Sequence, residues 1–205
     1  MAAPSKNVLL TGFDAFGGED VNPSALAVEQ LANETIAGRQ IVTAILPCIF
    51  GQSVLELKGV MDEVNPELVI CVGQAGGRDA INLERIAVNI DDAAMPDNAG
   101  AQPVDQVISA DGPAAYWATL PGKEIVRSLE AKGIRAVVSM SAGTFVCNHV
   151  FYRLMQTLEN RPGVRGGFIH VPFLPEQANG KAPQPSMPLE QIVESLRIAT
   201  MASLL

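Results

Sequence analysis

The residues best suited to chemistry lie in one stretch of the chain, which runs from Ile134 into the segment after Cys147. Ile134 to Met140 is apolar and β-branched, which predicts a buried strand. Ser141 to Thr144 is small and polar, so the chain can turn there. Apolar residues then recur on one helical face, at Val150, Phe151, Leu154, Met155 and Leu158. The pattern predicts a strand, a tight turn and a helix, with Thr144 as the N-cap.

Cys147 falls in the first turn of this predicted helix, and that position favours a reactive thiol. A free thiol has a pKa of about 8.5, so little of it is the nucleophilic thiolate at neutral pH. A helix N-terminus carries about half a positive charge and unpaired amides, which favour a thiolate and could receive a developing oxyanion. The alternative is a small buried hydrophobic residue, as most free cysteines are, and the turn alone leaves both open.

The chain has two histidines, so a cysteine–histidine mechanism would have to use one of them. His149 lies two positions after Cys147 on the same predicted helix, where side chains do not face each other. His170 lies in a short strand-like run, Phe168 to Val171, between a glycine pair and two prolines. A histidine at the end of a strand can meet the start of a helix, which favours His170 as the base. A structural histidine in the core or in a loop is the alternative.

The composition narrows the class of function. A length of 205 residues with 48% hydrophobic residues predicts one domain, residues 1–205, with a sizeable core. The net charge of −8 argues against nucleic acid or an anionic membrane as a partner. Three cysteines without a C-x-x-C pair indicate a reducing compartment and no disulfide framework. We expect neither a signal peptide nor a membrane span.

Strands and helices alternate along the chain, which predicts an α/β fold with a mainly parallel sheet of about six strands. Further strands are predicted at Val8–Thr11, Gln40–Leu46, Leu68–Val72 and Ile81–Ile90. Helices are predicted at about Asn22–Ala32, Gln52–Val64, Lys123–Lys132 and Leu189–Leu204. The segment Pro172 to Pro188 is proline-rich and is expected to be irregular.

Three strand exits carry loops that could form a site, at residues 12–18, 73–78 and 141–147. The first loop is rich in glycine, but Gly18 stands where a P-loop needs lysine, and the spacing does not fit a dinucleotide fingerprint. Its two aromatic residues, Phe13 and Phe16, could wall a pocket or fill the core.

Four carboxylates near these loops could orient a histidine: Asp14, Glu84, Asp91 and Asp92. Glu84 stands before Arg85 in the predicted strand 81–90, so it could instead pair with an arginine at an exposed edge. The residues alone leave this choice open. Residues 91–121 form a long excursion, and long ordered loops are usually functional. We expect Tyr116 and Trp117 to pack this excursion down or to form a subunit contact.

Several blocks, in order along nearly the whole chain, together resemble the pyroglutamyl peptidase I family, also called the pyrrolidone-carboxylate peptidases. The blocks are Leu10–Gly18 with Asn22–Ser24, Gly73–Arg78, Glu84–Arg85 with Asn89–Asp92, Ser141–His149 and Ile169–Gln177. The resemblance implies a cytosolic cysteine exopeptidase, a hydrolase that removes an N-terminal pyroglutamyl residue from peptides and needs no metal or cofactor.

Carried over residue by residue, the resemblance implies a triad of Cys147 as nucleophile, His170 as base and Glu84 as the residue that orients the histidine. It also implies a three-layer α/β/α sandwich related to nucleoside phosphorylases, and a homo-oligomer, either a dimer or a tetramer. One position departs from the pattern of many bacterial members, because Ala94 stands where they carry arginine.

The chemistry of pyroglutamate agrees with the residues present. Its lactam is neutral, and Phe13, Phe16 and Phe145 would form an apolar slot for it. Burial of an unpaired ammonium there would be costly, so free N-termini would be rejected. The lactam needs hydrogen bonds, which we expect near Gln74 and the 12–18 loop. Val146 completes the predicted substrate-binding set.

Two other functions remain as alternatives. A phosphorylase-like enzyme of related fold would need a phosphate cradle, and Arg78 and Arg85 are the basic residues near these loops. A non-catalytic redox module built on Cys147 would usually have a resolving cysteine nearby, and neither Cys48 nor Cys71 is adjacent in sequence.

Overall fold

The computed structural model describes residues 6–178 and 184–205 and is built around a seven-stranded sheet in the order β2-β3-β1-β4-β9-β5-β8. The strands are β1 (Asn7–Phe13), β2 (Thr35–Ile36), β3 (Arg39–Leu46), β4 (Leu68–Gln74), β5 (Ile81–Glu84), β8 (Ala136–Ser139) and β9 (Arg165–Val171). Four of the six pairings are parallel; β2 runs antiparallel to β3, and β5 runs antiparallel to β9. The expected mainly parallel sheet is confirmed, with a two-residue strand added at one edge.

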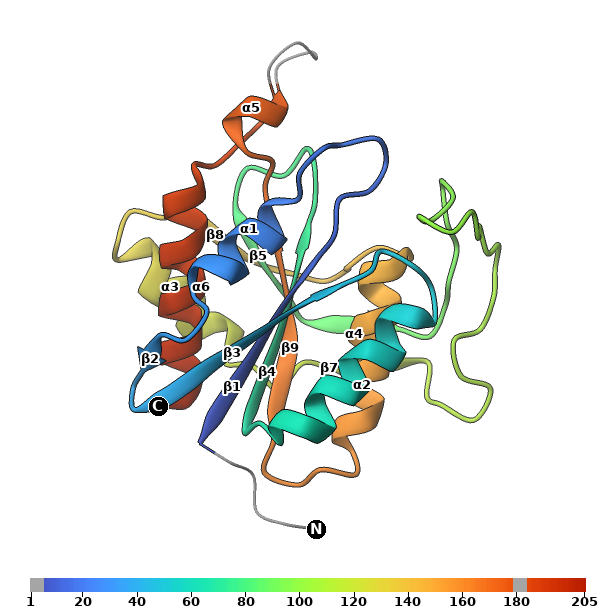
Figure 1. Cartoon of the computed structure of the whole chain (residues 1–205), viewed down its shortest axis with the longest axis horizontal. Coiled ribbons are helices and arrows are strands. Elements are labelled where there is room, and N and C mark those ends of the chain that lie inside the picture. The colour runs from blue at the N-terminus through green and yellow to red at the C-terminus, as the bar shows by residue number, and fades with distance from the viewer. Residues whose placement is uncertain (1–5, 179–183) are drawn as a thin grey trace.

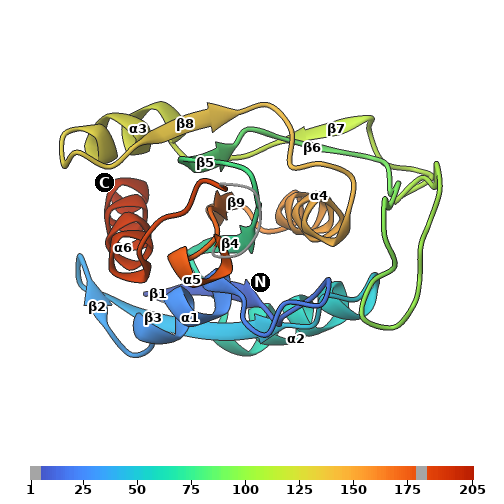
Figure 2. The same cartoon turned by 90° about the horizontal axis from the view of Figure 1, so that it is seen from above.

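Helices cover both faces of this sheet, so the expected three layers are confirmed (Figures 1 and 2). One face carries α1 (Pro23–Gln30), α3 (Gly122–Glu130) and α6 (Leu189–Leu204). The other carries α2 (Gln52–Val64) and α4 (Val146–Leu158). The short helix α5 (Pro175–Ala178) lies beyond the end of β9, at the top of Figure 1. Within the described ranges, no helix is long and apolar enough to span a membrane.

Alternation along the central strands sends their side chains into two separate cores. In β4, Ile70 and Val72 belong to the core under α1 and α6, while Val69 and Cys71 belong to the core under α4. All seven residues of β4 are buried, as expected for a strand covered on both faces. Because successive side chains point to opposite faces, the position of a residue in its strand decides on which face of the sheet its side chain lies.

The prediction of one strand from Ile81 to Ile90 was wrong. The chain leaves the main sheet after Glu84, and β6 (Ile86–Val88) pairs instead with β7 (Ala115–Trp117) in a second sheet. Arg85 marks the junction, because its N–H donates to Ser139 O at 2.8 Å while its C=O accepts from Ala118 N at 3.0 Å. Apolar alternation is the same in both strands and cannot reveal the change of sheet.

Two further predictions around the Cys147 helix were wrong. The strand before it, β8, lies at the edge of the sheet, and Val137 is 40% exposed rather than buried. Thr144 does not cap α4, because the N-cap residue is Phe145 and no side chain bonds to the helix start. The Thr144 hydroxyl donates instead to Asp92 O at 2.7 Å. The predicted buried face of the helix is confirmed.

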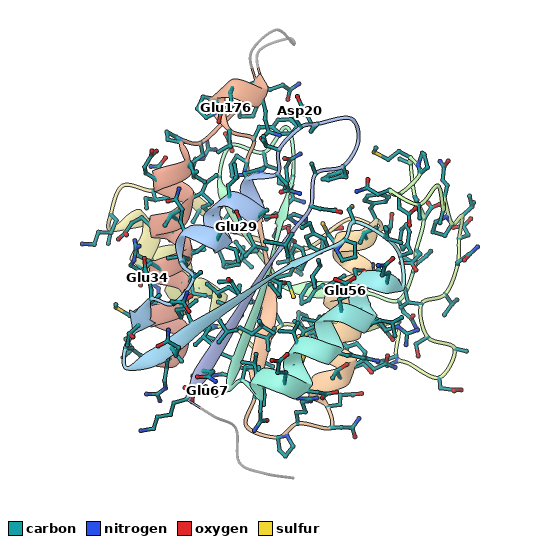
Figure 3. The ribbon with its side chains drawn as sticks, in the orientation of Figure 1. Asp20, Glu29, Glu34, Glu56, Glu67 and Glu176 are labelled. Atoms are coloured by element: carbon teal, nitrogen blue, oxygen red, sulfur yellow. The ribbon has the colours of Figure 1, made fainter. Side chains whose placement is uncertain are left out.

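Ion pairs at the surface join segments that are distant in sequence. Arg197 of α6 donates to Glu34 at 2.8 Å, and Arg39 of β3 pairs with Glu67 just before β4. Figure 3 labels both glutamates among acidic side chains spread over several elements. Partly exposed pairs of this kind stabilise a fold only weakly, so the two cores carry most of its stability.

Candidate active site

The sulfur of Cys147 lies directly over Gly73, near the carboxyl end of β4. A Cβ built on Gly73 would lie 2.8 Å from Cys147 Sγ, closer than such atoms approach each other. Gly73 is the register partner of His170 on the neighbouring strand β9. A glycine is therefore required at this point, because the nucleophile occupies the space of its side chain.

His170 is held by Glu84, as the family resemblance implies. The Nδ1 atom donates to Glu84 Oε1 at 2.8 Å, and the two residues are only 3% and 2% exposed. β5 runs antiparallel beside β9 and places Asn82 opposite His170, so Glu84 lies two residues along on the same face. With Nδ1 engaged, Nε2 is the ring nitrogen left for proton transfer.

The four carboxylates of the sequence analysis have different partners. Asp14 Oδ1 accepts from Cys48 N at 2.6 Å and from Asn98 at 3.2 Å, so it ties loops together. Asp91 accepts from His149 Nδ1 at 2.7 Å, and the side chain of Asp92 is exposed. Of the four, Glu84 is the one that contacts His170.

Arg78 also binds the carboxylate that holds His170, a contact that the sequence analysis missed. Its Nη1 donates to the same Glu84 oxygen at 2.6 Å, and its Nη2 donates to Ser141 O at 3.0 Å. Arg78 follows a glycine-rich loop and Glu84 ends a strand, so no local period relates the two residues.

The start of α4 is fixed to the segment that follows β5. The buried Asn148 side chain accepts from Val88 N at 3.0 Å and donates to Val88 O at 2.9 Å and Ile90 O at 3.1 Å. No side chain caps the helix, so the first-turn amides of Val146 and Cys147 lack side-chain acceptors. These amides form an electropositive group beside the sulfur.

The three cysteines differ in their access to solvent. Cys48 and Cys71 are buried, whereas Cys147 is partly exposed. Burial raises the pKa of the Cys48 and Cys71 thiols to about 12. Burial also raises the pKa of Cys147 well above its ordinary value, with Cys48, Glu84 and Cys71 acting in the same direction and Arg78 opposing them. Desolvation, the largest of these causes, favours the protonated thiol, in opposition to the helix N-terminus.

Aromatic side chains gather around Phe145, which stands two residues before Cys147. Phe145 packs on Phe16 with ring centroids 6.0 Å apart and on Phe50 at 5.4 Å, and all three are partly exposed. Phe13 is only 1% exposed and packs against Phe168, so it supports the site from the core. The sequence did not point to Phe50 as a site residue, although Phe50 follows the end of the predicted strand Gln40–Leu46 just as the three candidate loops follow theirs.

Val146 and Gln74, the other two predicted substrate-binding residues, do not belong to this aromatic cluster. Val146 is completely buried, so its side chain packs in the core rather than facing a substrate. The Gln74 side chain lies on the sheet face opposite Cys147, where its carbonyl oxygen accepts from Gln177 Nε2 at 2.9 Å. Alternation explains this placement, because Gly73 and Gln74 must point to opposite faces.

The excursion 91–121 covers one side of the site. Asp97 accepts from Phe50 N at 2.9 Å, and Asn98 donates to Ala15 O at 2.8 Å, so the excursion binds two of the site loops. Ala94, the departure from the family pattern, is exposed. Tyr116 packs on Tyr152 at 4.8 Å and holds the far end down, as expected, whereas Trp117 is 60% exposed.

A cavity of about 500 Å³ lies beside Glu84, between β5, β8 and the start of α3. Its lining includes Trp117 and Arg85 but neither Cys147 nor His170. The Arg85 guanidinium lies 5.5 Å from the centroid of the Trp117 indole. In the ranges that the structure describes, no three His, Cys, Asp or Glu side chains gather as metal ligands would.

Comparison with known proteins relates the whole chain to one family. A sequence model of the family described as pyroglutamyl peptidase matches residues 6–204. The pyrrolidone-carboxylate peptidase of Bacillus licheniformis is 56% identical over 201 residues, which is 98% of this chain and 93% of that protein.

Solved structures agree with the sequence comparison. Pyroglutamyl peptidase I of Bacillus amyloliquefaciens has a TM-score of 0.94 at 49% identity, and 97% of each chain is covered. Pyrrolidone carboxyl peptidase of Thermococcus litoralis has a TM-score of 0.95 at 39% identity, covering 98% of this chain and 94% of that one. The chain with Cys147 over Gly73 and His170 bound to Glu84 therefore belongs to the pyroglutamyl peptidase family.

Proposed function

We propose that this chain hydrolyses the amide bond after an N-terminal pyroglutamyl residue of peptides, with Cys147, His170 and Glu84 as its catalytic triad. The observation that carries the proposal is the buried His170–Glu84 hydrogen bond, on the strand beside the glycine that accommodates the Cys147 sulfur. The family of the chain supports the reaction class.

In the first step, His170 Nε2 takes the thiol proton of Cys147 while the sulfur attacks the scissile carbonyl carbon. The raised pKa of Cys147 supports this order, because the thiol must lose its proton during attack. The carbonyl oxygen becomes an oxyanion, which the first-turn amides of α4 can receive.

The tetrahedral intermediate then collapses and the carbon–nitrogen bond breaks. The leaving amine takes the proton from His170, and pyroglutamate stays bound to Cys147 as a thioester. Water attacks this thioester with His170 as base, which releases pyroglutamate and returns the proton to the thiol. Glu84 holds the imidazole in the required tautomer and stabilises the imidazolium in both steps.

Specificity follows from the uncharged N-terminus of the substrate. Phe16 and Phe50 pack on Phe145 at the start of α4, and this partly exposed aromatic cluster can pack on a neutral lactam. An ammonium placed against these rings would lose part of its hydration, and the rings offer it no hydrogen-bond acceptor in return. The phosphorylase alternative is weaker, because Arg78 binds Glu84 and Arg85 packs on Trp117.

The decisive assay compares pyroglutamyl, prolyl and glutaminyl amides of one fluorophore. We expect turnover of the pyroglutamyl amide and about 10⁴-fold lower kcat/KM for the prolyl amide, which lacks the lactam carbonyl. Limited iodoacetamide, followed by peptide mass spectrometry, should label Cys147 before Cys48 and Cys71, because those two are buried. Activity should fall in step with Cys147 labelling.

Comparable turnover of the prolyl amide, or full activity after Cys147 is alkylated, would refute this function. The homo-oligomer and the cytoplasmic location implied by the family remain predictions. Light scattering on the purified chain measures the first, and cell fractionation the second.

A further inference from the structure

We propose that Arg78 is a positioning residue of this site, which neutralises the buried Glu84 so that His170 stays unprotonated until Cys147 gives up its proton. The inference rests on the proposed function, since it assigns a role within the same triad. It also adds a second task to Arg78, which is to hold the segment that leads into the nucleophile helix.

The burial of Glu84 creates the need for a cation. Its side chain is completely buried, and Oε1 accepts both from Arg78 at 2.6 Å and from His170 at 2.8 Å. Its second oxygen, Oε2, has no hydrogen-bond partner within the described part of the chain. A buried carboxylate without a cation would be costly, so the charge has to be balanced by one of these two neighbours.

The charges around the triad show what Arg78 changes. Glu84 comes from β5, Arg78 from the β4–β5 loop and Cys147 from α4. Cys71 of β4 and Cys48 also act electrostatically on the Cys147 thiol. With Arg78 in place, Glu84 is neutralised and the imidazole can remain neutral. Without it, protonation of His170 becomes the way to balance Glu84, and an imidazolium cannot accept the Cys147 proton.

Arg78 also reaches the chain just before the nucleophile. Its Nη2 donates to Ser141 O at 3.0 Å, and its Nη1 lies 3.4 Å from Ser139 Oγ. This segment joins β8 to α4, so one guanidinium links the triad carboxylate to the segment that leads to Cys147. Arginine suits both tasks, because its planar fork can bind two acceptors at once.

The test measures the pH dependence of kcat/KM for a pyroglutamyl amide and, separately, the pH dependence of iodoacetamide labelling at Cys147. Arg78→Met should lower kcat about 10- to 100-fold, less than the loss of the base itself. The ascending limb of both profiles should move up by about one pH unit, because loss of the Arg78 cation favours the protonated forms of His170 and Cys147. Arg78→Lys keeps the charge and should restore the limb while recovering only part of kcat.

Two further variants separate charge from structure. Arg135→Met removes an exposed arginine that pairs with Asp79, next to Arg78, and should leave both profiles unchanged. In Arg78→Met with Glu84→Gln the carboxylate is gone as well, so the limb should return towards the wild-type position. Melting temperatures identify any variant that fails to fold. If Arg78→Met does not fold, the position of the ascending limb is measured in Arg78→Lys, and a shifted limb there would contradict the role of the charge.

An unshifted limb in folded Arg78→Met, or a loss that Arg78→Lys does not reduce, would overturn the role of Arg78. Failure of the proposed function looks different, because the wild-type chain would then not cleave the amide at all. The labelling profile would still show whether Arg78 controls the ionisation of Cys147.

Discussion

At the residue scale, the two histidines show that the same pairing can serve different purposes. His170 and His149 each donate through Nδ1 to a buried carboxylate, at 2.8 Å from Glu84 and 2.7 Å from Asp91. His170 lies on β9 opposite Gly73, the residue over which the Cys147 sulfur sits. The His149 ring packs edge-on against Phe50, with ring centroids 5.5 Å apart. Position on the element, rather than the pair itself, decides which histidine can act as the base.

We therefore expect His170→Ala to lower mainly kcat and His149→Ala to lower mainly stability. His170→Ala should lose at least about 10²–10⁴-fold in kcat, the usual worth of general-base help. Its stability should change less, because Glu84 keeps Arg78 as a partner. His149→Ala should retain most of kcat but lose about 1–3 kcal/mol of stability, since it leaves the buried Asp91 carboxylate without its hydrogen-bond donor. Steady-state kinetics and denaturant unfolding measure both, and the reverse ranking in kcat would contradict the assignment.

At the element scale, the site depends on how closely α4 approaches the central strands. Gly73 lets the Cys147 sulfur and the Phe168 ring meet over β4, at 2.8 and 2.9 Å from the position of a Cβ. The sulfur can rotate away from an added methyl group, while the Phe168 ring is completely buried and cannot. The strand end and the helix start are therefore matched to each other at this one residue.

Gly73→Ala tests this match. The new methyl group should turn the sulfur out of line, with a loss of about 100-fold in kcat, because a displacement of about 1 Å can cost that much. Overpacking should also lower stability by about 1–3 kcal/mol. Gly59→Ala is the matched control, since nothing lies within 4 Å of a Cβ there and α2 continues through it. It should gain about 0.5–1 kcal/mol and keep full activity. Normal kinetics in Gly73→Ala would show that the sulfur does not need this space.

At the scale of the whole molecule, burial of the thiols links folding to pH. Burial raises the pKa of Cys48 and Cys71 from 9.0 to about 12, so the folded protein keeps protons that the unfolded chain releases above pH 9. The unfolded state then binds fewer protons, and stability must fall as pH rises through this range.

The free energy of unfolding should accordingly decrease between about pH 9 and pH 12. Each such thiol contributes about 1.4 kcal/mol per pH unit once the unfolded chain is ionised. Cys71→Ala should be less stable near neutral pH because of the cavity, yet its stability should fall less steeply with pH. Urea unfolding from pH 8 to pH 11 gives both slopes. Parallel slopes in the two proteins would contradict this account.

Most of the fold and part of the site could be predicted from the sequence, because the signals concerned are local. The apolar period identifies α2, α6 and the buried face of α4, and the strand exits point to Gly73, Cys147 and His170. The family resemblance points to Glu84. These conclusions need only a few neighbouring residues or a matching block, and the bounds predicted for α2 and α6 agree with the structure.

Tertiary structure alone decided how these pieces meet. The register of β5 against β9 brings Glu84 to His170, and the β4–β5 loop brings Arg78 to the same oxygen. The chain changes sheet at Arg85 although the apolar pattern continues, and Gln74 faces away from the sulfur because Gly73 faces towards it. Such choices depend on pairing and packing between elements distant in sequence, and a local period carries no information about the partner that an element will meet.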